Sequence, residues 1–566
     1  MKKNWKYDPI KNKRTFKDLE PATENLLLKR GINTTKKLEK FLSPDYEEGM
    51  YDPFLLSGIK KAVNRFLKAR QNKEKICVYG DYDADGVTSS VLLHFFLSEL
   101  GVDNFCYIPD RDKEGYGLNT KAIDYIKGKE ADLIITVDCG ITNKEEVEYA
   151  KEKGIDVIIL DHHHVPPEIP KAVAVVDPKR KQGKYPFDEL AGVGVAFKFA
   201  QAVAQKTKDY EDEKLKWYLD LVAIGTVADC VPLVEENRVL VKFGLIVLSK
   251  TKNVGLKQLF KVGNININEN CFPNSQQVSF QIAPRINAAG RMDHANIAYE
   301  LLSRRETQIA QARELALELE AQNSHRQKVT NYITQSVEDN LAKLKKVPKV
   351  IIQSSPHWMI GVIGLAAGKL ADKFNRPTIL LQDTGSNCRG SGRSVEGFNL
   401  VESLERNGAW LKKFGGHNQA VGLTVSNKNF PKFKEVFIQD VEKHLPKTVD
   451  KKIYVDVQVK EEEINQKLCN EVSLLEPFGK GNEAPIFLWK KAAVADKKLL
   501  GKQGKHLKIW LKDNKGERLL EAIGFGLGES FEEIQPGNKI DVLFHIEENN
   551  WNGRKNLQLR LIDLDY

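Results

Sequence analysis

The sequence predicts a multidomain α/β protein whose last part is a small β-barrel. Three patterns indicate this. Apolar runs rich in Val and Ile alternate with helical segments between about residues 74 and 180, and a helical stretch without glycine or proline covers residues 304–346. Apolar and polar residues then alternate from about residue 452. At roughly 150 residues per domain, the 566-residue chain has room for three or four domains.

The first pattern consists of five short apolar runs, as expected of a parallel sheet that is covered on both faces. An aspartate follows each run, and the carboxyl ends of parallel strands meet at one edge of a sheet, so we expect these acids to gather around one site. For Asp110 and Asp177, an ordinary role in a loop or helix cap is the alternative. The runs are Ile76–Tyr79, Phe105–Ile108, Leu133–Val137, Val157–Leu160 and Val173–Val176, and the acids are Asp81, Asp110, Asp138, Asp161 and Asp177.

The second pattern predicts a long connecting helix, because residues 304–346 place apolar side chains at helical spacing among mixed charges. After Val347 and Pro348, a further α/β pattern begins with Val350–Ile352 and continues through glycine-rich loops to about residue 445. We therefore expect a second, smaller α/β domain after the helix.

The third pattern predicts a barrel of the OB-fold type, since several strands of period two are separated by polar turns. On one strand Lys508 and Trp510 lie opposite the apolar face, with His506 and Lys512, and a basic strip with an aromatic ring suits single-stranded DNA. A solvated face with one half-buried Trp is the alternative. The alternating residues are Ile453, Val455 and Val457; Leu507, Ile509 and Leu511; Val542, Phe544 and Ile546; and Leu557, Leu559 and Leu561.

The composition excludes several classes of protein. With 41% hydrophobic and 29% charged residues, the chain is of ordinary globular composition. The start MKKNWKYDPIKNKRTF has no apolar core of a secretory signal, and no run approaches the roughly 18 apolar residues of a membrane span, so we expect a cytoplasmic protein. The seven cysteines form no C-x-x-C pair, which argues against a disulfide framework or a zinc knuckle. A net charge of +9 permits a polyanionic partner without requiring one.

The segment ICVYGDYDADGVTSS indicates a metal site. Asp81, Asp83 and Asp85 occupy alternate positions directly after a strand, and such crowded carboxylates favour a neutralising cation. An EF-hand is excluded, since Leu92 stands where that loop needs its Glu and a strand precedes the motif.

Two further strand ends add ligands of mixed type. Asp138 follows one strand, and Asp161 followed by three consecutive histidines follows another. Hard divalent ions such as Mn²⁺ accept carboxylate and imidazole together, so this set suits a pair of such ions better than zinc alone. Asp229, in GTVADCVPL, follows an amphipathic helix and by itself reads only as a helix C-terminal residue, and His164 has no assigned role.

Taken together and in order, these motifs resemble those of the DHH phosphoesterases. The resemblance implies two divalent ions, Mn²⁺ or Mg²⁺, with Asp138 bridging them, and it implies that His163 faces the scissile phosphate, with Asp161 beside it as a second catalytic residue. Two ions would activate water and stabilise the leaving oxygen of an in-line displacement. The implied metal ligands are Asp81, Asp83, Asp85, Asp138, His162 and Asp229.

Other segments are similar to the exonuclease branch of that superfamily, namely PDRDKEGYGLN, SFQIAPRINAAGRM, CRGSGRSVEGFNL, KFGGHNQAVGL and LLEPFGKGNEAPIF. Tyr79, where related pyrophosphatases have a metal-binding His, favours the same branch. Met359 replaces a polar residue of the DHHA1 motif, and neighbouring His357 could substitute for it. The resemblance implies substrate-binding roles for Arg111, Tyr116, Arg285, Arg291, Ser391, Arg393 and His417, with Arg111, Ser391 and Arg393 forming a pocket for a 5′-terminal phosphate.

The implied division is an unassigned N-terminal segment (1–50), a DHH catalytic domain (51–303), the connecting helix (304–346), a substrate-binding DHHA1 domain (347–447) and an OB-fold domain (448–566). The implied activity is 5′-to-3′ hydrolysis of single-stranded DNA to 5′-mononucleotides in recombination and repair, with a single-strand-binding protein and a repair helicase as protein partners. A phosphodiesterase of short oligonucleotides or cyclic dinucleotides is one alternative, although such enzymes usually lack the barrel. A non-enzymatic scaffold is another, but it requires eroded metal motifs.

Overall fold

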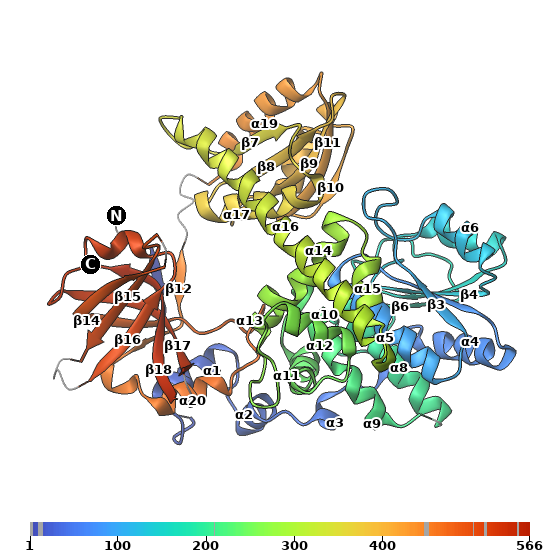
Figure 1. The fold of residues 1–566 in the computed structure, drawn as a ribbon, viewed down its shortest axis with the longest axis horizontal. Helices are drawn as coiled ribbons and strands as arrows, with labels where there is room; N and C mark the ends of the chain where they lie inside the picture. The colour runs from blue at the N-terminus through green and yellow to red at the C-terminus, as the bar shows by residue number, and fades with distance from the viewer. Residues whose placement is uncertain are drawn as a thin grey trace. The chain divides into compact units, whose positions relative to one another are not determined.

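The computed structural model describes residues 4–9, 15–208, 210–446, 452–501, 503–513, 518–551 and 554–566 (Figure 1). The chain divides into two compact units. The barrel unit contains residues 1–51, 230–243 and 452–566, and the α/β unit contains residues 52–229 and 244–451. The predicted domain boundary at residues 447–448 lies outside the described residues. Within the described part of the chain, no helix is both long and apolar enough to cross a membrane.

A five-stranded parallel sheet in the α/β unit confirms the predicted fold class. Its strand order is β3-β2-β4-β5-β6, so the chain reverses its direction of winding between β2 and β4. In sheets of this kind, ligands bind outside the carboxyl ends of the strands at that point. Both central strands are buried along their whole length, which explains their unbroken apolar runs. The strands are β2 (Ile76–Tyr79), β3 (Asn104–Tyr107), β4 (Leu133–Val137), β5 (Asp156–Leu160) and β6 (Ala174–Val176).

Helices cover both faces of this sheet. On one face α6 (Thr120–Gly128) and α7 (Lys144–Glu152) share an apolar core with the strands. On the other lie α5 (Ala84–Glu99) and α8 (Gly192–Thr207), and α10 (Leu219–Ala228) packs against both of these helices. The sequence predicted an amphipathic helix before Asp229, and this prediction was wrong. The helix, α10, is buried on every side because it runs between other helices.

The predicted connecting helix is present but shorter than expected. It is α16 (Ile309–Ala342), and a 3₁₀ turn at Glu306–Gln308 precedes it. Its buried residues form one stripe at helical spacing, which is the feature that predicted the helix. They are Ala312, Ala316, Leu319, Asn323, Thr330, Ile333, Val337 and Leu341.

The smaller α/β lobe follows α16 in the same unit. Its sheet has the order β10-β11-β9-β8-β7, in which only β7 and β8 run parallel to each other. Its helices are α17 (Ile360–Phe374), α18 (Leu400–Arg406) and α19 (Phe430–His444). Its strands are β7 (Ile351–Ser355), β8 (Thr378–Asp383), β9 (Asn387–Arg393), β10 (Lys413–Gly416) and β11 (Ala420–Ser426).

The C-terminal barrel confirms the predicted OB-fold. Its strands follow the order β14-β15-β16-β18-β17, and pairing of β14 with β17 closes the barrel. Leu507, Ile509 and Leu511 are buried, as their alternation predicted. The pattern missed β14 and β16. Two register shifts interrupt β14, and on the buried side of β16 only Leu520 is a large apolar residue, beside Ala522 and Gly524. The strands are β14 (Phe487–Leu500), β15 (His506–Lys512), β16 (Leu519–Gly524), β17 (Lys539–Trp551) and β18 (Arg554–Asp565).

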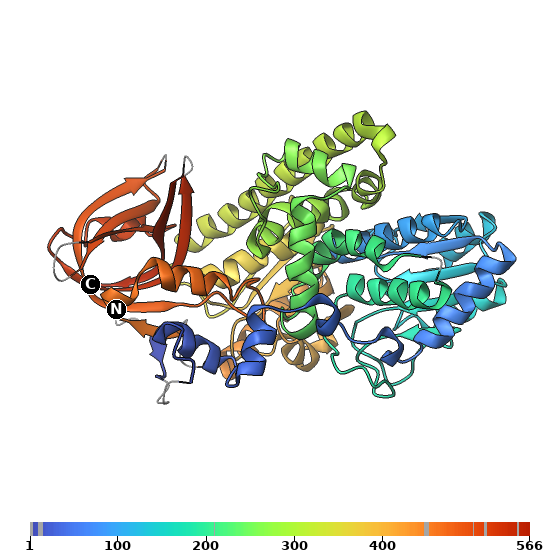
Figure 2. The same ribbon diagram turned by 90° about the horizontal axis from the view of Figure 1, so that it is seen from below.

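The N-terminal segment, which the sequence left unassigned, forms part of the barrel unit. Strand β1 (Trp5–Tyr7) pairs in parallel with β12 (Ile453–Val455), and α1 (Pro21–Lys29) packs on β13 (Val457–Val459) and on α20 (Gln466–Ser473) (Figure 2). Buried Arg238 donates hydrogen bonds to the carbonyl oxygens of Phe41 and Leu475. Segments far apart in the sequence therefore share one core.

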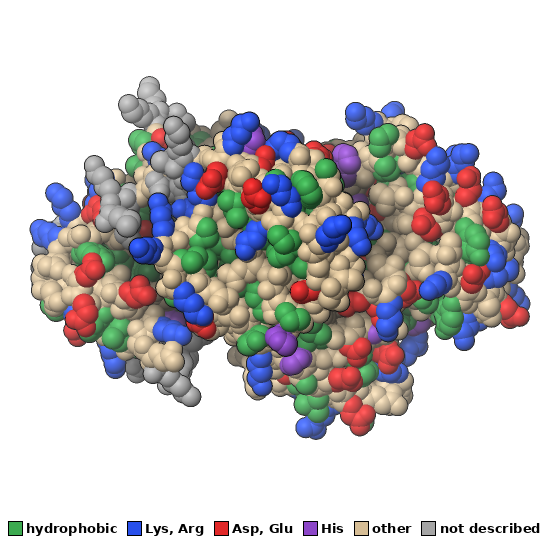
Figure 3. All heavy atoms as spheres, turned by 90° about the horizontal axis from the view of Figure 1, so that it is seen from above, with side chains coloured by type: hydrophobic (Ala, Val, Ile, Leu, Met, Phe, Trp, Pro, Cys, Tyr) green, Lys and Arg blue, Asp and Glu red, His purple; other side chains and the backbone are tan. Residues whose placement is uncertain are grey.

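Charged side chains of both signs are interspersed on the face of the molecule shown in Figure 3. This mixture accords with a chain that carries 86 basic and 77 acidic residues, so that its net charge of +9 is small compared with the number of charges. Any preference for an anionic ligand must therefore come from local clusters.

Candidate metal centre

The three aspartates after β2 are positioned by the start of α5. Asp83 is the N-cap of this helix, and its Oδ1 accepts hydrogen bonds from the backbone N–H groups of Asp85 (3.0 Å) and Gly86 (3.1 Å). A Cβ atom at Gly86 would lie 2.5 Å from the carbonyl oxygen of Asp81, so the glycine of the motif allows the loop to close on the helix. Asp81 and Asp85 are buried.

Asp85 is fixed by the N-terminus of α8. Its two carboxylate oxygens accept hydrogen bonds from the N–H groups of Gly192 (2.7 Å) and Val193 (2.9 Å). These are two of the N–H groups that a helix leaves without intrahelical partners, and the helix dipole favours a negative charge there. A Cβ atom at Gly225 of α10 would lie 2.7 Å from Asp85 Oδ1, so this glycine leaves room for the carboxylate.

Asp138 lies in the left-handed backbone region, with φ of +61°. This conformation is uncommon for residues other than glycine, although Asp and Asn adopt it more readily than most. Its side chain packs against α8, where a Cβ atom at Gly192 would lie 2.7 Å from Asp138 Oδ1. The tight turn after β4 therefore directs this carboxylate toward the ligands contributed by α5 and β5.

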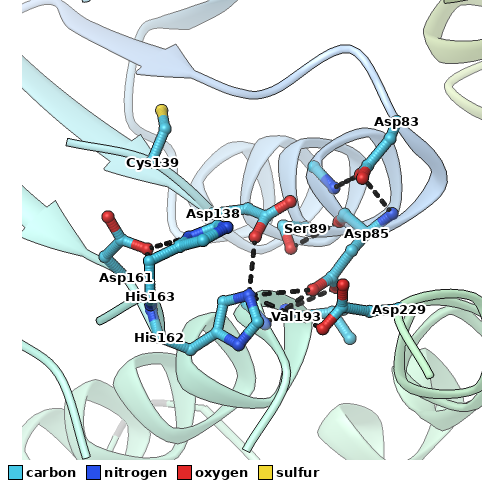
Figure 4. A network of polar contacts seen from close by, with 12 residues as sticks. Asp83, Asp85, Ser89, Asp138, Cys139, Asp161, His162, His163, Val193 and Asp229 are labelled. Atoms are coloured by element: carbon cyan, nitrogen blue, oxygen red, sulfur yellow. Dashed lines mark hydrogen bonds and ion pairs between the residues drawn. The ribbon is translucent and has the colours of Figure 1, made fainter. Parts of the chain in front are cut away.

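His162 connects the carboxylates (Figure 4). Its Nε2 lies 3.1 Å from Asp138 Oδ1, 3.7 Å from Asp229 Oδ2 and 3.9 Å from Asp85 Oδ2. Burial, together with the charge of His163, lowers the pKa of His162 to about 3, so the ring is neutral and able to act as a ligand.

The donor atoms fall into two groups that suit two cations. Asp81, Asp83 and Asp138 form one group, Asp85, His162 and Asp229 form the other, and the atoms within each group lie within 4.8 Å of one another. Asp138 also forms a third group with His162 and His163, so it lies next to both sets, as the resemblance implied for a bridging ligand.

A cation fits this centre for two reasons. Asp81 Oδ1 and His162 Nε2 are buried without a hydrogen-bond partner in the described structure, which is costly unless another group binds them. Burial raises the pKa of Asp81, Asp85 and Asp138 well above its ordinary value, and neighbouring carboxylates raise it further. Divalent ions bound by these oxygen and nitrogen donors would satisfy the open donor atoms and offset the repulsion.

Asp161 faces His163 rather than the two ligand groups. Its Oδ1 lies 2.7 Å from His163 Nδ1 and its Oδ2 accepts a hydrogen bond from the N–H of Ile141 (2.8 Å). Burial alone would raise the pKa of Asp161 and lower that of His163. Their contact reverses both effects, lowering the pKa of Asp161 and raising that of His163 to about 9. The Tyr116 hydroxyl, 3.0 Å from His163 Nδ1, donates to the carbonyl oxygen of Asp138 (3.2 Å).

A cluster of arginines lies in the same unit, and we call Arg111, Arg291, Arg326 and Arg393 the arginine cluster. Burial lowers the pKa of Arg291 to about 10, and the charges of the other three arginines lower it further, while the charge of Asp83 opposes the shift. Burial and the charge of Arg111 likewise lower the pKa of Arg393. Within the described part of the chain, none of the four forms an ion pair with a carboxylate. Such a cluster favours an anionic ligand.

The smaller α/β lobe carries two residues of the predicted phosphate pocket, Ser391 and Arg393, on β9. Arg393 Nη1 donates hydrogen bonds to Ser391 Oγ and to the carbonyl oxygen of Gly392, each over 2.8 Å. A Cβ atom at Gly364 of α17 would lie 3.1 Å from Arg393 Nη2, so this glycine makes room for the guanidinium. A Cβ atom at Gly361 would lie 2.2 Å from the carbonyl oxygen of Arg291, so α17 approaches α14 (Ala283–Met292) closely.

Other predicted residues occupy different surroundings. Arg285 forms an ion pair with Glu320 (2.5 Å), and His417 lies exposed in the turn between β10 and β11, so their substrate-binding roles stay predictions. Asp110 accepts hydrogen bonds from the N–H groups of Asp112 and Lys113, and Asp177 from that of Lys179, which supports the turn-forming alternative for both.

Tyr79 and Met359, which differ from the residues found at these positions in related motifs, both pack in apolar surroundings. Tyr79 lies in the sheet core, and its hydroxyl donates to the carbonyl oxygen of Gly117 (2.8 Å). Met359 packs in an apolar cluster with buried Trp358, while the side chain of His357 is exposed.

Sequence reasoning missed Arg326, because an arginine within a long charged helix carries no signal of its own. It also missed Asn287, whose Oδ1 accepts a hydrogen bond from the N–H of Ala84 (2.8 Å) and so fixes the first turn of α5. The only hint for Asn287 was its place inside the segment SFQIAPRINAAGRM.

Comparisons with known proteins agree with this arrangement. The family models for the DHH family N-terminal domain, the DHHA1 domain and the RecJ OB domain match residues 75–226, 348–443 and 455–563. The chain is 39% identical to the single-stranded-DNA-specific exonuclease RecJ of Bacillus subtilis, over 98% of this chain and 69% of that protein. It is 34% identical to the protein of the same name from Haemophilus influenzae, over 96% of each.

Solved structures give the same result. The crystal structure of RecJ from Thermus thermophilus in complex with Mn²⁺ matches with a TM-score of 0.81 and 28% identity, over 97% of this chain and 76% of that chain. The complex of the same protein with Mg²⁺ matches with a TM-score of 0.76 and 27% identity, over 97% and 75%.

Proposed function

The chain belongs to the RecJ family of single-stranded-DNA-specific exonucleases, and from that premise we propose that it removes 5′-mononucleotides from the 5′ end of single-stranded DNA in recombination and repair. One observation carries the proposal: two sets of metal donors, linked because Asp138 of one set also groups with His162 of the other, lie in the same unit as arginines that form no ion pair with a carboxylate in the described structure. Together they offer a centre for hydrolysis and a site for a terminal phosphate.

Asp81, Asp83, Asp85, Asp138, His162 and Asp229 would hold the two ions in this proposal, and the donor groups of the structure support that ligand set. When bound, two divalent ions such as Mn²⁺ or Mg²⁺ supply an activated water and neutralise the leaving oxygen of an in-line displacement. The side chains around them orient the substrate. Asp161 fixes the ring of His163, which faces the scissile phosphate, and the hydrogen bond of Tyr116 to the backbone of Asp138 places its ring beside His163.

We attribute the 5′-to-3′ direction of hydrolysis to the arginine cluster. Arg111 comes from the loop after β3, at the same edge of the sheet as the metal ligands, while Ser391 and Arg393 come from β9 of the smaller lobe. Guanidinium groups bind phosphate in a bidentate manner, so these residues would select strands that end in a 5′-phosphate. The phosphodiester bond presented to the metal centre would then be that of the first nucleotide.

The remaining assignments follow the same proposal. We propose the functional division into residues 1–50, 51–303, 304–346, 347–447 and 448–566, in which residues 1–50 belong to the barrel unit. We also propose that the barrel contacts the strand beyond the first nucleotides. A cytoplasmic location and contacts with a single-strand-binding protein and a repair helicase accompany a role on chromosomal DNA. A phosphodiesterase specific for cyclic dinucleotides would have no evident use for the barrel, and a non-enzymatic scaffold none for the complete ligand set.

Substrate class provides the test. The chain is incubated with Mn²⁺ and single-stranded DNA, blunt duplex DNA, single-stranded RNA or a cyclic dinucleotide, and mononucleotides are quantified by chromatography. We expect rapid release from single-stranded DNA and slow release from duplex. Faster hydrolysis of the cyclic dinucleotide than of single-stranded DNA would contradict the proposal.

A further inference from the structure

The basic strip that the sequence suggested on the barrel is largely compensated by its own neighbours. Lys508 Nζ lies 2.5 Å from Glu521 Oε1 on the adjacent strand β16, and 4.9 Å from the centroid of the Trp510 ring. The ammonium thus has both an anionic and an aromatic partner, so a DNA phosphate would have to compete with Glu521. Lys508 alone is therefore a weak contact for a DNA phosphate.

An exposed aromatic side chain lies close to Lys508, at the end of the strand pair where β15 begins and β16 ends. Phe525 directly follows β16 and is 66% exposed, whereas most large apolar side chains of the barrel are buried. Its ring packs edge-on against His506, the first residue of β15, with ring centroids 5.4 Å apart. We call Phe525, His506 and the adjoining Lys505 the Phe525 rim.

The backbone around this rim is fixed by hydrogen bonds between two loops. The N–H of Gly526 donates to His506 Nδ1 (3.0 Å), which makes Nδ1 an acceptor and leaves the ring proton on Nε2. The N–H of Gly528 donates to the carbonyl oxygen of Lys505 (3.0 Å). A Cβ atom at Gly528 would lie only 2.0 Å from the carbonyl oxygen of Gly504, so the loops pack at a distance that only glycine permits. Phe525 therefore lies on a turn whose backbone is held by these hydrogen bonds.

The surroundings of the rim suit a nucleic acid strand. Lys505 is exposed at the end of the β14–β15 loop, and exposed Lys498 lies on β14 opposite Lys508 in the strand register. Glu529, in the following turn, is exposed and carries the opposite charge. In barrels with this strand order, the surface of the second and third strands and the loop between the first two strands bind oligonucleotides. The rim combines such a loop with an exposed ring and lysines, as sequence-independent binding of unpaired bases requires.

We propose that the Phe525 rim is a stacking site for one unpaired nucleobase of the bound strand. The base stacks on the Phe525 ring, and His506 packs edge-on against that ring and fixes its orientation. The proposal deepens the proposed function and rests on it. It predicts that this contact adds affinity for long strands and contributes nothing to cleavage of strands too short to reach the barrel.

The test compares Phe525→Ala with Leu519→Ala in the full-length protein. Leu519 is a matched control, since it is 59% exposed and lies at the opposite end of β16. Dissociation constants are measured by fluorescence anisotropy in metal-free buffer, for a long single strand of normal bases and for one of the same length built from abasic sites. Because stacking on an aromatic ring contributes about 1–3 kcal/mol per base, Phe525→Ala should weaken binding of the normal strand roughly 5- to 150-fold. Binding of the abasic strand should not change, and Phe525→Trp should restore the normal affinity.

Equal losses on the normal and abasic strands, a loss of the same size in Leu519→Ala, or no loss at all in Phe525→Ala would overturn the stacking site. The rate of hydrolysis of a 5′-phosphorylated trinucleotide should be the same in Phe525→Ala and wild type. If wild-type protein failed to hydrolyse single-stranded DNA in Mn²⁺, the proposed function itself would fail, whatever the binding data showed.

Discussion

Asp138 shows at the scale of one residue how the metal centre is built. Its left-handed backbone turns the carboxylate away from the strand axis, and glycine at position 192 lets α8 approach it closely. Because it belongs to two donor groups, its loss should affect both proposed ions at once, whereas loss of Asp83 should affect one.

The substitution Asp138→Asn tests this role while retaining the shape of the side chain and the tolerance for a left-handed backbone. We expect hydrolysis in Mn²⁺ to fall to background, while affinity for single-stranded DNA stays within about twofold, because phosphate contacts elsewhere supply most of it. In metal-free buffer the variant should melt at a higher temperature than wild type, since one buried carboxylate is removed from a repulsive cluster. Near-normal turnover would disprove the assignment of Asp138 as a shared ligand.

A second residue-scale prediction concerns Arg393. Charge-assisted hydrogen bonds contribute about 1.5–3 kcal/mol, so Arg393→Ala should reduce the preference for 5′-phosphate over 5′-hydroxyl ends roughly 10- to 100-fold. The measurement is kcat/KM on matched oligonucleotides. Arg389→Ala, four positions earlier on β9 and exposed, is the control and should not alter the preference. An equal loss on both kinds of end would instead make Arg393 a general contact to the DNA backbone.

At the scale of elements, the loop between β3 and α6 contributes to both parts of the proposed site. It carries Arg111 of the arginine cluster and Tyr116, which contacts His163 at the metal centre. Glu114 fixes this loop from within. Its Oε1 accepts hydrogen bonds from the Tyr107 hydroxyl (2.7 Å) and Asn119 Nδ2 (3.2 Å), and its Oε2 accepts one from the N–H of Asp110 (2.6 Å).

Glu114→Ala should therefore reduce kcat/KM about 10-fold on 5′-phosphorylated strands, because three charge-assisted hydrogen bonds that position the loop are lost. Glu114→Gln should recover part of the activity, since its amide oxygen can still accept some of these bonds. Asp112→Asn, exposed on the same loop, is the control. A melting temperature that falls while kcat/KM is unchanged would show that Glu114 stabilises the loop without serving the site.

The elements that could be predicted are those whose pattern arises from burial. The parallel strands β2 and β4 read as continuous apolar runs because both faces are covered, and the buried stripe of α16 repeats at helical spacing. Strand β14 could not be found in this way, because register shifts break its alternation and charged residues interrupt its sequence.

The candidate site was predictable to the extent that its residues follow strands. Asp81, Asp138 and His162 could be placed together because parallel strands end at one edge of the sheet. The arginine cluster was only partly predictable, since Arg326 approaches Arg291 through the packing of α16 on α14, which no local pattern reports. The compensation of Lys508 by Glu521 depends in the same way on strand pairing.

At the scale of the whole molecule, the barrel unit is assembled from three stretches of the chain. Leu26 and Leu27 of the N-terminal segment are fully buried in the same apolar cluster as Val457 and Leu468. The N-terminal segment should therefore depend on the barrel for its structure.

Deletion of residues 452–566 should accordingly expose the N-terminal segment to proteolysis. We expect brief trypsin treatment of the truncated chain to cleave within residues 15–51, while the same segment of the full-length chain resists, because Leu26 and Leu27 lose their packing partners. Mass spectrometry of the fragments locates the cleavage sites. Equal resistance in both proteins would show that the segment folds without the barrel.

The central claim is that two metal ions at the shared Asp138 centre cleave single-stranded DNA from its 5′ end. The most direct measurement follows a 5′-phosphorylated single strand, labelled at either its 5′ or its 3′ end, through the first seconds of reaction with Mn²⁺. We expect the 5′ label to appear at once as a mononucleotide and the 3′ label to remain on progressively shorter strands, with neither product formed by Asp138→Asn. A mononucleotide released first from the 3′-labelled strand, or unchanged hydrolysis by Asp138→Asn, would contradict this account.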